Sequence, residues 1–204
     1  MLLVIETATI ACSVALIAGA AVVAERHELV GRGHAERLVP QIGELLAELP
    51  AGERVDAILV DCGPGSFTGV RVGLAAARAL GLAWGVPVRG CSSLALLAAA
   101  GINAAERATV AITGGHGELF VQHFAAGPLR ATGDLASLTP IAAAQNAERL
   151  VIGSGAAALV AARGDGEARD AVPRAADARL LPAELAALPP SPIYGRAPDA
   201  RPAA

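Results

Sequence analysis

The hydrophobic pattern of the chain begins with three short apolar runs. They cover residues 2–5, 12–17 and 21–29, and polar or small residues interrupt them at positions 7–9 and 19–20. Short apolar runs that are bounded by such breaks are typical of strands. The pattern therefore predicts two consecutive β-hairpins at the start of the chain.

The period of the pattern changes at about residue 35. Apolar residues now recur three or four positions apart with charged residues between them, which predicts an amphipathic helix. Pro40 falls early in this segment, in its first turn or at a kink, and Pro50 and Gly52 end it. The apolar face of the helix consists of Leu38, Val39, Ile42, Leu45, Leu46 and Leu49.

A glycine-rich loop is the most specific feature of the chain. It follows a predicted strand at residues 55–61 and precedes a long apolar helix that Gly85 ends. Glycine permits positive φ and close backbone approach, and either Ser66 or Thr68 can cap the helix. The loop consists of Gly63, Pro64, Gly65, Ser66, Phe67 and Thr68.

The next elements complete a recognisable topology. A short strand is predicted at residues 86–89, and a helix runs from Ser92 or Ser93 to residue 100. Three antiparallel strands followed by strand and helix crossovers match a ribonuclease H-like lobe of the α/β class.

A second, smaller lobe is predicted to begin near residue 104. Its predicted strands cover residues 109–113, 118–125 and 149–152. Residues 163–179 mix charge and glycine, which predicts a mobile surface segment. We divide the chain into a first lobe with partner-binding helices (1–103), a degenerate second lobe (104–185) and an extended Pro/Ala-rich tail (186–204) that Tyr194 pins to the body.

Composition limits the possible functions. Apolar residues make up 54% of the 204 residues and aromatic residues only 2%, so small and branched side chains must build the core. All sixteen basic residues are arginine, and the net charge is -3. Without a basic stripe the chain is not expected to grip nucleic acid by itself.

Cysteine usage and hydropathy predict a cytoplasmic protein without a membrane span. The three cysteines, Cys12, Cys62 and Cys91, each lie in or beside an apolar run, which is typical of buried thiols in a reducing compartment. The apolar residues 8–24 are too few for a span, and residues 1–6 lack the basic start of a signal peptide.

The glycine loop could serve as an anion cradle or as a tight corner. A P-loop is excluded because its lysine is missing from the whole chain. The glycine spacing also differs by one residue from the dinucleotide-binding fingerprint. Arg71 and Arg78 form a basic edge on the following helix, which could meet a phosphate, a partner's acidic residues or acids of the same chain.

Small residues recur along the same helix at Gly69, Gly73 and Ala77. Such a ridge lets another element approach closely. That element is either the protein's own sheet or first helix, or a helix of another subunit. The histidines are scattered and lack the spacing of a helical metal pair, so no metal site is predicted.

Several segments resemble the TsaB (YeaZ) family. They are LLVIETATIACSVAL, HAERLVPQIGELL, GPGSFTGVRVGLAAARALGLA, the strands around GELFV, and the ending PIYGRAPDA. The resemblance implies an actin/sugar-kinase/chaperone-ATPase-like fold of two ribonuclease H-like lobes. It also implies a non-catalytic scaffold that binds TsaD in the biosynthesis of threonylcarbamoyladenosine in tRNA.

The resemblance further implies the partners and the interface. TsaD and TsaE are the expected partners, tRNA is met only through the complex, and the chain alone is expected to form a homodimer. No cofactor is expected, except ATP or ADP within the complex. The helices at residues 34–49 and 68–84 imply an interface made by Leu38, Ile42, Leu45, Gly69, Val70, Arg71, Gly73, Leu74, Ala77 and Arg78.

Two departures from related sequences agree with the lack of catalysis. The first hairpin loop begins with Glu6, where nucleotide-using relatives carry an Asp-x-Gly-Thr motif, and it lacks that glycine. Residues 113–115 read Thr-Gly-Gly where many TsaB proteins have Asp-Ala-Arg. The alternatives are an ATP-dependent phosphotransferase of the same fold and a glycopeptidase-like metalloprotease.

Overall fold

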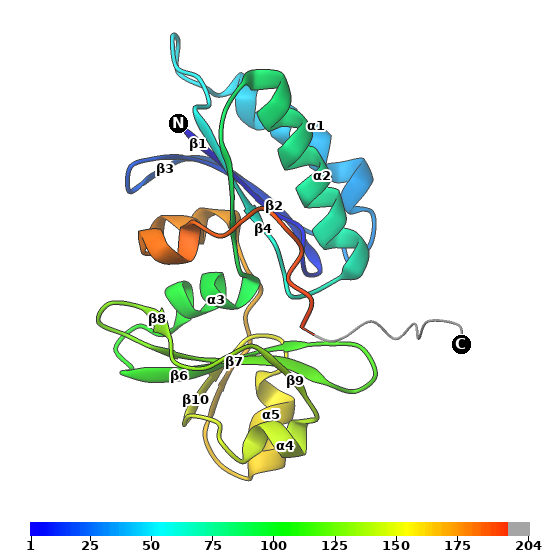
Figure 1. Ribbon diagram of the computed structural model, residues 1–204, viewed down its shortest axis with the longest axis vertical. Coiled ribbons are helices and arrows are strands. Elements are labelled where there is room, and N and C mark those ends of the chain that lie inside the picture. The colour runs from blue at the N-terminus through cyan, green and yellow to red at the C-terminus, as the bar shows by residue number, and fades with distance from the viewer. Residues whose placement is uncertain (196–204) are drawn as a thin grey trace.

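The computed structural model describes residues 1–195 and contains two β-sheets that share one central helix layer (Figure 1). The chain builds the first sheet and its helices, then the second sheet, and finally returns to the first (Figure 1). The last described residues run along the edge of the first sheet and reach the second.

The first sheet has the strand order β3-β2-β1-β4-β5. Strands β1, β2 and β3 pair antiparallel, and β1, β4 and β5 pair parallel. The five strands are β1 (Leu2–Glu6), β2 (Ala11–Ala18), β3 (Ala21–Leu29), β4 (Ala57–Asp61) and β5 (Val88–Cys91).

Helices cover both faces of this sheet. On one face, α1 (His34–Ala47) and α2 (Phe67–Trp84) lie side by side, and their buried residues pack with Leu3 and Ile5 of β1 (Figure 1). On the other face, α3 (Ser93–Gly101) and the 3-10 helix η1 (Ala175–Leu180) pack with Val4. Because side chains alternate along a strand, neighbouring residues of β1 belong to different cores.

The second sheet has the order β11-β10-β6-β7-β8, and β9 also pairs with β7. Its strands are β6 (Arg107–Thr113), β7 (Leu119–Ala125), β8 (Arg130–Ala131), β9 (Ala136–Leu138), β10 (Leu150–Ile152) and β11 (Glu167–Arg169). The short helices α4 (Pro140–Ala144) and α5 (Ala156–Arg163) cover its outer face, as Figure 1 shows.

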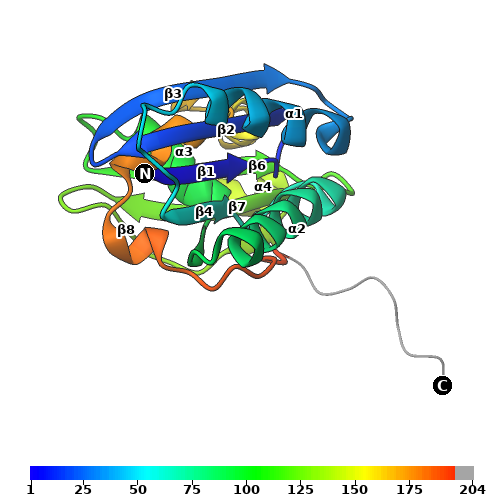
Figure 2. The ribbon, with the colours of Figure 1, turned by 90° about the horizontal axis from the view of Figure 1, so that it is seen from above.

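Helix α3 connects the two halves of the molecule. Leu96 packs in the core of the first sheet, whereas Leu94 and Leu97 pack in the core of the second. Figure 1 shows α3 between the two sheets, and in Figure 2, seen from above, α3 lies behind the strands of the first sheet. This position explains why α3 is apolar all round rather than amphipathic, because both of its sides are buried.

The structure confirms the predicted order of elements in the first half of the chain and alters two details. The short strand is Val88–Cys91 rather than residues 86–89, and α1 ends at Ala47. The prediction of a surface segment at residues 163–179 was wrong in part. Residues Ala175 and Ala178 of η1 are buried against the first sheet because small side chains fit closely there.

Candidate functional site

The glycine loop folds as a tight corner against the first hairpin. Gly63 has a φ of 92°, which only glycine adopts readily. The backbone N–H of Ser66 donates to the carbonyl oxygen of Ala8 at 2.6 Å, and a Cβ on Gly65 would overlap that carbonyl. Ser66 is the N-cap of α2, since its Oγ accepts from Gly69 N at 3.2 Å.

The small-residue ridge of α2 packs against the same hairpin. A Cβ on Gly69 would overlap the carbonyl oxygen of Thr7, and one on Gly73 would overlap the Thr7 hydroxyl. That hydroxyl donates to the Gly69 carbonyl at 2.8 Å. Of the two roles left open for the ridge, the structure shows internal packing on the protein's own sheet.

This packing changes which residues can face a partner. Eight of the ten predicted interface residues are buried in the core of the chain itself, so only Arg71 and Arg78 remain exposed. The buried ones are Leu38, Ile42, Leu45, Gly69, Val70, Gly73, Leu74 and Ala77. These eight residues define the faces of α1 and α2 that point into the protein. A partner protein would therefore contact the opposite, solvent-exposed faces of the two helices.

The opposite face of α2 is mainly small and apolar, with Arg71 and Arg78 along one edge. Between the ends of the helix, its other exposed positions are Thr68, Ala75, Ala79, Leu82 and Ala83. Leu82 is 87% exposed, and Val39 of the neighbouring α1 is 66% exposed. The charged side chains of α1 instead pair with β3. Arg37 donates to Glu28, and Glu44 accepts from Arg26. An exposed apolar face of this kind is typical of interaction surfaces.

The basic edge of α2 binds the C-terminal residues of the same chain. Arg71 Nη2 donates to the Tyr194 hydroxyl at 2.8 Å, and its guanidinium lies 3.2 Å from the ring centre of Phe67. Arg78 Nε donates to the carbonyl oxygen of Pro190 at 3.2 Å. The alternative of intramolecular contacts is therefore the observed one, although the acceptors are a hydroxyl and a carbonyl rather than acids. Tyr194, which was predicted to pin the tail at residues 186–204, makes this contact, while residues 196–204 of the tail lie outside the described residues.

Two buried carboxyl groups lie at the ends of adjacent parallel strands. Glu6 ends β1 and Asp61 ends β4, and both are fully buried. Asp61 accepts from the backbone N–H of Gly63 at 2.7 Å and from the Ser93 hydroxyl at 2.7 and 2.8 Å. Glu6 Oε1 accepts from Ala8 N at 2.8 Å, while Oε2 has no hydrogen-bond partner in the described structure.

Burial makes both groups weaker acids than usual. It raises the pKa of Asp61 to about 7, although the Ser93 and Gly63 hydrogen bonds favour the ionised form. The pKa of Glu6 is raised well above its ordinary value, first by burial and then by the charge of Asp61. Sequence reasoning considered Glu6 alone. The signal for Asp61 was its position directly after an apolar strand parallel to β1.

A cleft of about 1120 Å³ lies between the two lobes, but the carboxyl pair does not line it. Ala8 and Gly65 line the cleft instead, and Glu6, whose Oε1 accepts from Ala8 N, is fully buried. None of the described residues that line the cleft is acidic. The polar ones are Thr9, Ser66, Arg71, Thr113, His116, Ser154 and Tyr194.

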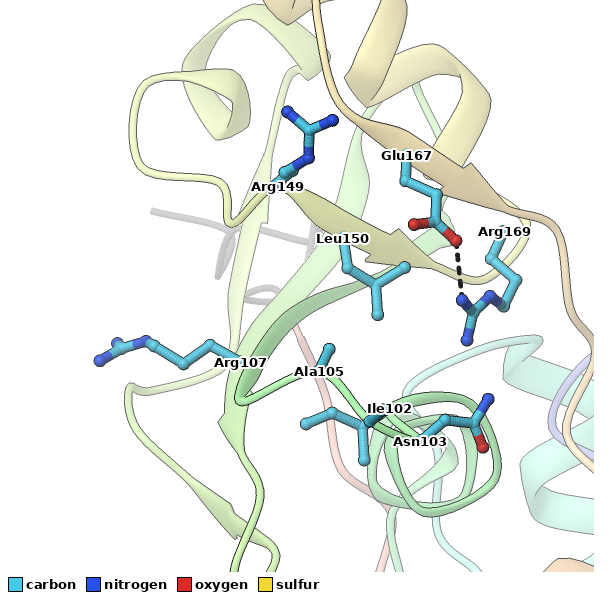
Figure 3. Close-up of a pocket in the computed structure, with 9 residues that line it drawn as sticks. Ile102, Asn103, Ala105, Arg107, Arg149, Leu150, Glu167 and Arg169 are labelled. Atoms are coloured by element: carbon cyan, nitrogen blue, oxygen red, sulfur yellow. Dashed lines mark hydrogen bonds and ion pairs between the residues drawn. The ribbon is translucent and has the colours of Figure 1, made fainter.

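A smaller cavity of about 350 Å³ lies at the far end of the second sheet. Its arginines do not converge on one point, because Arg107 and Arg149 point away from Arg169 (Figure 3). Arg107 binds Glu148 at 2.6 Å, and Arg169 binds Glu167 at 2.7 Å. These pairings account for Arg107 and Arg169 without a ligand.

The thiols and histidines of the first lobe have structural roles. All three cysteines are free and buried, and burial raises the pKa of Cys12 and of Cys62 to about 11. His34 is buried, and its Nε2 lies 2.9 Å from the carbonyl oxygen of Thr9. Within residues 1–195, no three His, Cys, Asp or Glu side chains gather as metal ligands would.

Comparisons with known proteins agree with this architecture. The family model for TsaD, tRNA N6-adenosine threonylcarbamoyltransferase, matches residues 23–134. The tRNA threonylcarbamoyladenosine biosynthesis protein TsaB of Haemophilus influenzae is 39% identical over 122 residues, or 58% of this chain and 51% of that protein.

Two solved structures from Pseudomonas aeruginosa are similar over nearly the whole chain. One is titled an uncharacterized protein with similarity to peptidase YeaZ, and the other YeaZ. The first is 30% identical with a TM-score of 0.80, and the match covers 96% of this chain and 99% of that one. The second is also 30% identical with a TM-score of 0.78, and the match covers 95% of this chain and 98% of that one.

Two sheets flanked by helices, with a cleft between the lobes, place the chain in the actin-like class of two-lobed ribonuclease H-like folds, as predicted. Within that class, the chain belongs to the TsaB (YeaZ) family. The chain spans about half or less of the length of the curated relatives it matches. Over the described residues, no helix has the length and hydropathy needed to cross a membrane.

Proposed function

We propose that this protein is a non-catalytic partner of TsaD in the biosynthesis of threonylcarbamoyladenosine in tRNA. The observation that carries the proposal is the exposed, mainly apolar face of α2, which lies beside α1 in a chain of the TsaB family. Its small and apolar positions lose little on desolvation, and the arginines at its edge, Arg71 and Arg78, already bind the C-terminal residues of the same chain. It therefore suits a lasting contact with another protein.

The buried carboxyl pair supports the lack of catalysis. A carboxylate that binds a metal or activates a substrate must reach the cleft, and neither Glu6 nor Asp61 lines it, since both are fully buried. Raised pKa values further reduce the negative charge that a cation would need. We therefore propose that the chain alone uses no cofactor, and that ATP or ADP binds only in the complex.

The same face offers a contact for a second copy of the chain when TsaD is absent. We propose a homodimer for the isolated protein and its replacement by the TsaD complex, which TsaE joins. Contact with tRNA occurs only through that complex, since the chain has no basic stripe. The proposed location is the cytoplasm, where tRNA is modified.

The test uses substitutions that place a charge on the exposed face. Ala79→Glu and Leu82→Glu should leave folding intact, because both side chains point to solvent. Each should reduce co-purification with TsaD by at least tenfold and should lower the threonylcarbamoyladenosine content of tRNA in cells that depend on this chain. The matched control is Val22→Glu, at an exposed position of β3.

Size-exclusion chromatography with light scattering completes the test. The wild-type chain should elute as a dimer alone and as a mixed complex with TsaD, and Ala79→Glu should be monomeric. An undisturbed TsaD complex with both glutamate variants would refute the proposed face. Tight binding of Mg-ATP by the isolated chain would instead favour the phosphotransferase alternative.

A further inference from the structure

Residues 188–195 form a strap along the edge of the first sheet. None of these residues is buried, although the strap lies against the corner between β4 and α2. We call this segment the C-terminal strap. It runs from β5 of the first sheet to β7 of the second, which Figure 1 shows in red.

Three backbone hydrogen bonds attach the strap to the first sheet. Leu188 and Gly90 exchange two of them, at 2.7 and 3.0 Å, and Ile193 N donates to the carbonyl oxygen of Cys62 at 2.8 Å. A Cβ on Gly90 would lie 2.8 Å from the carbonyl oxygen of Pro189. A glycine at position 90 is therefore needed for the strap to pack against the edge of β5.

Apart from Ile193, which is half-buried against the core of the first lobe, the side-chain contacts of the strap lie at the protein surface. Arg78 donates to the Pro190 carbonyl, and Arg71 donates to the Tyr194 hydroxyl. Tyr194 is 59% exposed, and both arginines are exposed. Hydrogen bonds that compete with water in this way contribute little each, so they hold the strap reversibly.

The far end of the strap is part of the wall of the cleft. Ile193, Tyr194 and Gly195 line it together with Phe120 of β7. A Cβ on Gly195 would overlap the Phe120 ring, so the strap touches the second lobe through its own backbone. Detachment of this end would widen access to the cleft while both sheets stay intact.

We propose that the C-terminal strap is a detachable wall of the cleft, latched by the contact between Arg71 and Tyr194. Segments with few buried apolar contacts open locally at a smaller free-energy cost than the whole fold. The strap meets this condition, since none of its residues is buried and, among the described residues 188–195, only Ile193 packs against a hydrophobic core. The proposal is independent of TsaD, because every contact that carries it lies within this chain.

Cys62 is a natural reporter of strap opening. Its Sγ is buried and lies 3.7 Å from the Pro189 carbonyl oxygen. Cys12 is equally buried in the same core, but it lies on β2, which β1 and β4 separate from β5, the strand to which the strap is attached. Local opening should therefore expose Cys62 and not Cys12, whereas global unfolding exposes both.

The experiment measures the rate of maleimide labelling of each cysteine by mass spectrometry, on the full chain at pH 8. In the wild-type chain Cys62 should react faster than Cys12. Tyr194→Phe removes only the latch hydroxyl, and it should speed the labelling of Cys62 about fivefold with no change at Cys12. Arg71→Lys should act in the same direction. The matched control, Arg54→Lys, should change neither rate.

A wedge at the far end provides an independent variant. Gly195→Val should push the strap from Phe120 and speed the labelling of Cys62, whereas Gly115→Ala, which adds a Cβ in open space in the same cleft, should not. Equal rates at Cys62 and Cys12 in the wild-type chain would overturn the proposal, since opening would then be global. Unchanged Cys62 rates in both Tyr194→Phe and Gly195→Val would also overturn it.

Discussion

At the scale of single residues, the contacts around Thr7 decide what the glycines of α2 are for. The Thr7 backbone and hydroxyl lie against Gly69 and Gly73 so closely that a Cβ has no space. The helix can approach the first hairpin only because these side chains are missing. The glycines therefore act in the fold of this chain, and not on a partner.

Gly69→Ala should destabilise the protein by about 3 kcal/mol, because its Cβ would overlap the Thr7 carbonyl, a backbone atom that cannot rotate away. Urea unfolding measures the change. The matched control is Gly43→Ala on α1, which meets nothing within 4 Å and should stabilise the helix by about 1 kcal/mol. Equal effects of the two substitutions would contradict this packing.

The buried Asp61 should make stability depend on pH. Its pKa is about 7 in the folded protein and 3.8 ordinarily, so the folded state binds the proton more tightly. Its contribution is fully present below about pH 4 and is lost as the pH rises through 7. Asp61→Asn should therefore flatten the fall in unfolding free energy between pH 5 and 8. Asp134→Asn, at an exposed acid, should not.

At the scale of elements, α2 begins where the glycine loop ends because Ser66 caps it. The Ser66 side chain accepts from Gly69 N, and Gly85, with a φ of 66°, ends the helix. The loop is thus a corner that starts α2 at a set angle to β4. Its neighbour α3 is capped in the same way, by Ser92, whose Oγ accepts from Leu94 N at 3.2 Å.

Ser66→Ala should lower the unfolding free energy by about 1 kcal/mol, because the N–H of Gly69 loses its acceptor. Thermal unfolding followed by circular dichroism measures this loss. Thr68→Ala is the matched control, since Ser66 and not Thr68 is the cap. A larger loss in the control would show that the cap lies elsewhere.

At the scale of the whole molecule, α3 packs against both sheets, which predicts that they unfold as one cooperative unit. Leu96 faces the first sheet and Leu97 the second, and both are buried. Because α3 belongs to both cores, a loss of packing between α3 and one sheet should also destabilise its packing against the other sheet. The returning η1, which packs with Leu96 on the first sheet, adds a second connection.

Leu96→Ala and Leu97→Ala should each cost about 3 kcal/mol and should leave a single unfolding transition. The fluorescence of Trp84 reports on the first lobe, while circular dichroism reports on both. The two signals should shift together in each variant. A variant in which circular dichroism changes before Trp84 fluorescence would indicate that the lobes unfold separately.

The sequence was sufficient for the local elements of the first half. The strand breaks, the amphipathic period of α1 and the glycine loop all depend on residues close together in the chain, so their patterns are legible without a structure. The same patterns did not reveal which face of α2 is free. From the sequence alone, Gly69 and Gly73 could allow close packing of either a partner's helix or the protein's own first hairpin.

Long-range contacts supplied the rest. Glu6 and Asp61 become neighbours only because β1 and β4 pair in parallel, and Arg71 finds Tyr194 only because the end of the chain returns to the first lobe. The local hydrophobic periodicity predicts whether a residue is buried, but it does not predict which distant segment of the chain packs against that residue. The sealed carboxyl pair and the strap are therefore properties of the tertiary structure alone.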